Sequence, residues 1–209
     1  MYQGSKPLME TYGVDEEIKQ ALLRRVELPS GGYLIIDYTE ALTIIDVNTG
    51  RYVGRTRLED TIVKTNIEAC KEVVRQLRLR DIGGIIIIDF IDMARPRNRQ
   101  QVLDTLGKEL ETDRTKTYIV ELSPLGLVEM TRQTVTEGLR AIPTKTCPPS
   151  NARAVSTPAE SMAFDFERRR GRLAGPAATG AFRCAVVPKV AATPTWEGGP
   201  KARGMGGGT

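Results

Sequence analysis

Residues 83–93 read GGIIIIDFIDM, and the apolar run at the centre of this stretch decides the expected fold. Four isoleucines in a row, at positions 85–88, follow two glycines and lead directly to Asp89. A continuous apolar run without alternation is typical of a strand that is buried on both faces of a sheet, as in α/β proteins. The stretch therefore predicts a central strand over residues 85–90 that carries a carboxylate near its end.

The segments on either side of this strand alternate between strand and helix patterns. β-Branched and apolar runs predict three more strands, over residues 33–37 (YLIID), 41–47 (ALTIIDV) and 117–122 (TYIVEL), and the apolar segment 125–131 follows the last of them. Helical spacing of apolar residues predicts helices over residues 14–25, 59–80 and 97–112. This order predicts an α/β fold with crossover connections.

The composition excludes several classes of protein. Among the 209 residues no apolar run approaches the ~20 that a membrane-spanning helix needs, and the first residues do not resemble a secretory signal. The three cysteines are too few and too widely spaced for a disulfide framework, so the cytoplasm is the expected compartment. The chain has no histidine, which excludes Ser-His-Asp triads and HExxH zinc sites. Hydrolytic chemistry would have to use carboxylates with a hard metal ion, or Lys and Tyr.

The last part of the chain differs from the rest in charge and composition. Residues 151–209 hold nine Lys and Arg against four Asp and Glu, whereas residues 1–150 hold 21 against 22. The net charge of +4 is therefore a poor guide to where a nucleic acid would bind. The same tail holds 14 of the 32 Gly and Pro residues, which places a boundary near residues 144–151.

Two expected strands end in acidic residues, and ligands of open α/β sheets bind at the carboxyl ends of strands. Asp46 ends one strand and Asp89 the other, and alternation along a strand puts Asn48 on the same side as Asp46. If the two strands are neighbours, two carboxylates and an amide oxygen meet, which suits Mg²⁺ or Mn²⁺. The alternative, that these strand-end aspartates only cap turns, stays open.

Three blocks of sequence resemble the catalytic core of the ribonuclease E/G family. They are GGYLIIDYTEALTIIDVNTGRYVG, TNIEACKEVVRQLRLRDIGGIIIIDFIDM and LGLVEMTRQ, and the resemblance runs from about residue 28 to residue 137. It implies a DNase I-like subdomain with a mixed sheet and flanking helices over residues 28–143, preceded in residues 1–27 by the end of an RNase H-like subdomain. It also implies that Asp46 and Asp89 bind the catalytic magnesium and that Asn48 assists them.

The resemblance further implies an activity. The family cleaves single-stranded, often A/U-rich RNA, leaving a 5′-phosphate and a 3′-hydroxyl, in the maturation of ribosomal and transfer RNA and in messenger decay. Magnesium can orient and activate water for such a reaction without histidine. The basic residues Arg95, Arg97, Arg99 and Lys116 are candidates for contacts with the RNA backbone, and a purely solvated surface is the open alternative.

Two departures from the family pattern limit these expectations. The S1 RNA-binding domain and the 5′-monophosphate sensor of the family would precede this region, and we expect neither in the chain. The family's Cys-Pro-x-Cys zinc link, which joins two chains, corresponds to residues 144–150, where Cys147 is followed by Ser150 in place of the second cysteine. We therefore expect weak zinc binding and weakened self-association through residues 144–209.

Residues 151–209 resemble the family's small C-terminal domain more loosely, and we expect a truncated, irregular or α+β tail that is disordered over its last ~15 residues. Three functions remain in view. The first is a magnesium-dependent endoribonuclease, and the second is a non-catalytic RNA-binding or assembly fragment of such an enzyme. The third, another metal phosphoesterase on an α/β sheet, is disfavoured by the family resemblance.

Overall fold

A computed structural model describes residues 2, 8–50, 58–123, 126–136, 138–141, 145–146, 155–156, 162 and 166. The chain forms two compact units, Leu8–Arg140 on the one hand and Met1–Pro7 with Ala141–Thr209 on the other. In the second unit, β7 (Lys145–Thr146) pairs antiparallel with β8 (Val155–Ser156). The first unit holds the large sheet, and Asp46, Asn48 and Asp89 all lie in it.

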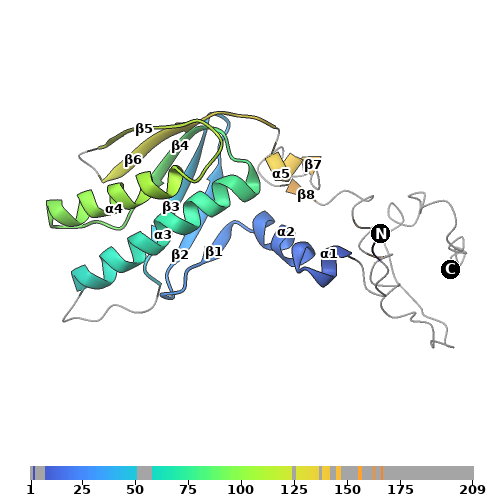
Figure 1. The fold of residues 1–209 in the computed structure, drawn as a ribbon, viewed down its shortest axis with the longest axis horizontal. Coiled ribbons are helices and arrows are strands. Elements are labelled where there is room, and N and C mark those ends of the chain that lie inside the picture. Colours follow the sequence, from blue (N-terminus) through green and yellow to red (C-terminus); the bar gives the residue numbers. More distant parts are fainter. Residues whose placement is uncertain are drawn as a thin grey trace, which may run out of the picture. The chain divides into compact units, whose positions relative to one another are not determined.

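The first unit is built on a mixed six-stranded sheet with the order β1-β2-β3-β4-β6-β5 (Figure 1). Only β3 and β4 run parallel, while the other neighbouring strands are antiparallel. The strands are β1 (Arg25–Glu27), β2 (Tyr33–Tyr38), β3 (Leu42–Asn48), β4 (Gly84–Asp89), β5 (Thr117–Leu122) and β6 (Leu127–Arg132). The expected α/β class with a mixed sheet and flanking helices is confirmed.

Two long helices, α3 (Leu58–Arg80) and α4 (Pro96–Leu110), lie side by side across one face of the sheet (Figure 1). The shorter helices of the described part of the chain include α1 (Leu8–Thr11), α2 (Val14–Leu22) and α5 (Gly138–Ala141). The buried stripes of the long helices meet every second residue of the central strands. Fully buried members of this core include Ile45, Ile86, Ile88, Val73, Leu77 and Leu106. None of the helices in the described part of the chain is long and apolar enough to cross a membrane.

Among the described residues, side chains on the other face of the sheet are exposed or only partly buried, which corrects one expectation from the sequence. Along β4, Ile86 and Ile88 are completely buried, but Ile85 is 50% exposed and Ile87 is partly exposed. The prediction that this strand is buried on both faces is therefore wrong. The reason is that the two helices that follow β3 and β4 both pack on the same face, and a run of isoleucines is equally compatible with one or two covered faces.

The elements otherwise lie within a few residues of the expected ranges, except at the start of the sheet. The expected helix over residues 14–25 ends earlier, at Leu22, and β1 follows it. Arg25 to Glu27 pair with Tyr33 to Ile35, so this short strand forms one edge of the sheet. The assignment of residues 1–27 to an RNase H-like subdomain stays a prediction, although β1 itself belongs to the large sheet.

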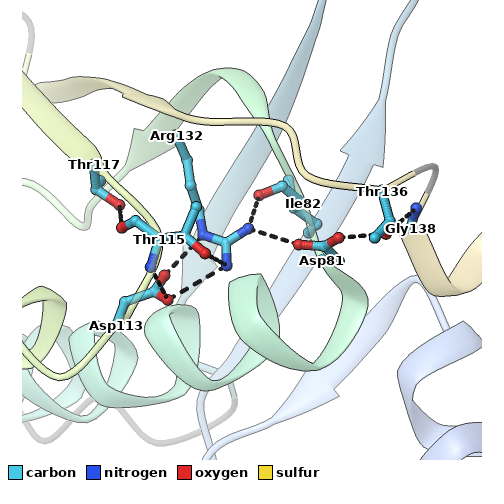
Figure 2. Close-up of polar contacts among 8 residues, drawn as sticks. All are labelled: Asp81, Ile82, Asp113, Thr115, Thr117, Arg132, Thr136 and Gly138. Atoms are coloured by element: carbon cyan, nitrogen blue, oxygen red, sulfur yellow. Dashed lines mark hydrogen bonds and ion pairs between the residues drawn. The ribbon is translucent and has the colours of Figure 1, made fainter.

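A buried arginine joins several elements at the end of the sheet where β4 begins (Figure 2). The Arg132 side chain, 3% exposed, donates from Nε to Asp113 Oδ2 at 2.8 Å and from Nη1 to Asp81 Oδ1 at 3.1 Å. Its Nη1 also donates to the carbonyl of Ile82, and its Nη2 donates to the Thr115 hydroxyl. This network connects β6 with the end of α3 and with the turn between α4 and β5.

Candidate active site

The two strand-end aspartates meet because β3 and β4 are parallel neighbours. In the register of this pair Asp46 lies directly opposite Asp89, so their backbones are about 4.8 Å apart. Both strands end here, at the carboxyl edge of the only parallel pair in the described sheet. Alternation along β3 places Thr43, Ile45 and Val47 against the helices, and therefore Asp46 on the open face of the sheet.

Asn48 lies two residues beyond Asp46 on the same face of β3. Its amide nitrogen Nδ2 donates to Asp46 Oδ2 at 2.9 Å, in a partly buried position. This bond fixes the orientation of both side chains. It also leaves one amide oxygen and three further carboxylate oxygens of the two aspartates as hard acceptors in the same place.

The electrostatics of the pair favour a cation. Burial, together with the negative charges of Asp46 and Asp92, raises the pKa of the Asp89 carboxyl above its ordinary value. Within the described residues no Lys or Arg forms an ion pair with Asp46 or Asp89. The nearby Arg24 is engaged elsewhere, because its Nη2 donates to Asp37 Oδ2 at 2.6 Å.

An open hollow of about 520 Å³ lies over these side chains. It is lined by Asp46, Val47, Asn48, Thr49, Asp89, Phe90, Ile91, Asp92 and Leu127. Sequence reasoning missed Thr49 and Asp92 as lining residues. The repeated spacing of acids in the DFID motif, residues 89–92, was the signal that could have drawn attention to Asp92.

The basic residues named from the sequence lie in different places. Arg95 and Arg97 are exposed where α4 begins, directly after the loop that contains Asp92. Arg99 donates from Nη1 to the carbonyl of Met93 at 2.8 Å, so it holds this loop rather than pointing freely into solvent. Lys116 precedes β5 at the opposite end of the sheet, roughly 15 Å or more from Asp89 at about 3.3 Å per residue along β4.

The donor set fits a hard cation and not a thiolate-bound metal. Among the described residues no three Asp, Glu, His or Cys side chains gather as metal ligands, so the site consists of two carboxylates and one amide. Such a set suits a small divalent cation that keeps water or phosphate oxygens as its other ligands. Burial raises the pKa of the Cys70 thiol to about 12, which keeps it protonated. Cys147 lies outside the described residues.

A model of the ribonuclease E/G family matches residues 1–135, a range that contains the whole sheet and all three residues of the candidate site. The chain belongs to the ribonuclease E/G family. It is 50% identical to ribonuclease G of Salmonella typhimurium (strain SL1344) over 167 residues, which are 80% of this chain and 34% of that protein.

Similarity extends to proteins named ribonuclease E. The chain is 44% identical to ribonuclease E of Nostoc sp. (strain PCC 7120 / SAG 25.82 / UTEX 2576) over 147 residues, 70% of this chain and 21% of that protein. Ribonuclease G of Haemophilus influenzae (strain ATCC 51907 / DSM 11121 / KW20 / Rd) is 46% identical over 168 residues. The chain thus spans about a third of the length of the ribonuclease G proteins that it matches.

Proposed function

We propose that the chain carries the catalytic module of an endoribonuclease that hydrolyses phosphodiester bonds in single-stranded, A/U-rich RNA with the help of Mg²⁺. The observation that carries this proposal is the opposed pair Asp46 and Asp89 at the carboxyl edge of the parallel strands, with no ion pair to a Lys or Arg among the described residues. Membership of a family whose relatives are named ribonucleases supports the same chemistry.

Each side chain of the site has a role in this proposal. Asp46 and Asp89 would hold the metal, with Mn²⁺ as an alternative to Mg²⁺, and Asn48 would orient Asp46 and add an amide oxygen. When bound, such a metal polarises a phosphoryl oxygen and provides an activated water. Arg95 and Arg97, which are exposed where α4 begins, would contact phosphates of an RNA strand that crosses the open hollow.

The cellular role follows from the same proposal. The module would act on ribosomal, transfer and messenger RNA in the cytoplasm, as part of RNA processing and decay. We propose that zinc binding by Cys147 and self-association through residues 144–209 are weak, because position 150 is a serine and not a second cysteine. Lys116 is placed far from the aspartates, so we assign it at most a peripheral contact with RNA.

The test is cleavage of a fluorogenic A/U-rich oligonucleotide by the full chain, with Mg²⁺ and with EDTA. We expect cleavage only with Mg²⁺, and a decrease of about a thousandfold or more in D46N and D89N, since losing a metal ligand removes several kcal/mol of transition-state stabilisation. D104N is the matched control, because Asp104 is exposed on α4 and bonds only to Gln100 among the described residues.

Two outcomes would contradict the proposal. Cleavage that is unchanged in both D46N and D89N would show that another site acts on RNA. RNA binding without any Mg²⁺-dependent cleavage would favour the second candidate, a non-catalytic RNA-binding or assembly module.

A further inference from the structure

The loop of residues 90–95, which leads from Asp89 to α4, is held by side chains of the two long helices. Glu59 on α3 accepts hydrogen bonds from the backbone N–H groups of Ala94 and Arg95, and Arg99 on α4 donates to the carbonyl of Met93. A further contact, which is closer to the site than these, is made by Asn66 on α3. It reaches Ile91, two residues beyond Asp89.

Asn66 makes two hydrogen bonds to the same backbone unit. Its Nδ2 donates to the carbonyl of Ile91 at 2.8 Å, and its Oδ1 accepts from the N–H of Ile91 at 3.2 Å. The side chain is completely buried, with Ala69 and Cys70 of the same helix in the adjoining core. A carboxamide can donate and accept at once, so one side chain satisfies both polar groups of a residue that has just left the sheet.

The hydrogen bonds between Asn66 and Ile91 hold a segment that lines the candidate site. Phe90, Ile91 and Asp92 border the hollow, and Asp89 precedes them directly. Without a fixed Ile91, the end of β4 could fray and the Asp89 carboxylate would sample orientations that turn away from Asp46. Partners that hold metal ligands in place typically change metal affinity or activity by 10–100-fold when they are removed.

We propose that Asn66 is a positioning residue of the metal site: it fixes the loop after β4 so that Asp89 stays opposite Asp46 on the same face of the sheet. This inference rests on the proposed function, because it assigns Asn66 a part in binding the cation. The competing explanation is that Asn66 only stabilises the fold, as any satisfied buried amide does.

The chain offers a matched control for that explanation. Gln76 is also on α3, is 1% exposed, and bonds with Glu72 and Arg80 of the same helix. It lies ten residues from Asn66, about 15 Å along the helix axis at 1.5 Å per residue. N66L and Q76L therefore each replace one buried amide of α3 by an apolar side chain, and only N66L frees the loop.

The experiment measures the dissociation constant for Mn²⁺ by electron paramagnetic resonance, and amide hydrogen exchange of residues 89–95, on the full chain. We expect N66L to bind Mn²⁺ about 10–100-fold more weakly and to exchange faster in the loop. Q76L should bind Mn²⁺ within about twofold of the wild type. Among the described residues R99M removes only the bond to Met93, and it should weaken Mn²⁺ binding in the same direction even if N66L does not fold.

The inference is overturned if N66L binds Mn²⁺ as the wild type does, or if Q76L loses as much affinity as N66L. It is equally overturned if N66L does not fold and R99M exchanges faster in the loop while keeping wild-type affinity. A wild-type chain that binds no Mn²⁺ at all would instead overturn the proposed function, and this inference with it.

Discussion

Each end of the sheet brings two aspartates close together, but the two ends differ in how the negative charge is met. Where β4 begins, Asp81 and Asp113 both bind Arg132, whose side chain is 3% exposed (Figure 2). Where β4 ends, Asp46 and Asp89 lie opposite each other, and no Lys or Arg of the described residues forms an ion pair with either. The first end supplies its own cation, and the second would, under the proposed function, take one from solution.

The pKa directions of the carboxyls follow the same division. The Thr136 hydroxyl and Arg132 lower the pKa of Asp81. Burial opposes ionisation of Asp113, but its hydrogen bonds with Arg132 and with the Thr115 N–H outweigh it and lower the pKa. Burial and two neighbouring acids raise the pKa of Asp89. A lowered pKa marks a carboxylate that the fold stabilises in its ionised form, and a raised one marks a carboxylate that lacks such a partner.

Removing the internal cation should have the largest effect on stability. R132M leaves Asp113 buried without its partner, so we expect the free energy of unfolding, measured by urea denaturation, to fall by about 3–5 kcal/mol. The matched control is R75M, because the bonds of Arg75 to Glu17 and Glu72 are solvent-exposed. It should change stability by less than about 1 kcal/mol. Equal decreases in the free energy of unfolding of R132M and R75M would contradict the expectation that the buried network stabilises the fold more than an exposed one.

The same substitution should destabilise the fold at one end of the sheet and not at the other. D113N removes the charge that Arg132 binds and should destabilise the fold by about 1–3 kcal/mol. D89N removes a charge that Asp46 and Asp92 repel; because Asp89 is solvent-exposed and the repulsion is screened, it should leave stability unchanged or raise it slightly without added metal. Denaturation in EDTA measures both. A clear loss of stability in D89N would mean that Asp89 has a structural partner.

The pH dependence of stability should separate the ends in a smaller way. The pKa values of Asp81 and Asp113 are lowered from 3.8 in the folded state. Their contribution to the free energy of unfolding is therefore complete above pH 3.8 and is lost as the pH falls below that value. Since the pKa of Asp89 is raised from 3.8, its protonation stabilises the fold as the pH falls through a range above 3.8. Urea midpoints between about pH 3 and pH 7 measure both. In D89N the stabilisation that protonation of Asp89 gives at falling pH should be absent. In D113N the stability should fall less steeply below pH 3.8 than in the wild type.

Local patterns in the sequence predicted the elements and the carboxylates, but not the contacts between distant residues. Apolar runs and helical spacing locate the strands and long helices because they depend on neighbouring residues alone. The position of Asp46 and Asp89 at strand ends is equally local. Whether Asp46 and Asp89 lie close together depends on whether β3 and β4 are neighbours, which local patterns do not determine. The strand register shows that they are neighbours.

The contacts missed from the sequence all join residues far apart in the chain. The sequence did not single out Asn66, because its partner Ile91 lies 25 residues further on. Arg132 binds Asp113 and Asp81, which are 19 and 51 residues away. The open face of the sheet was missed for a different reason: isoleucines favour strands whether helices cover one face or two.

The central claim, that the Asp46–Asp89 end takes its cation from solution, is tested most directly by counting bound Mn²⁺ ions. Electron paramagnetic resonance titration of the full chain should give one tightly bound Mn²⁺ that Mg²⁺ displaces. This binding should be lost in both D46N and D89N and kept in D104N. A bound ion that persists unchanged in D46N and D89N would contradict the account, because the cation would then lie somewhere other than between the two opposed aspartates.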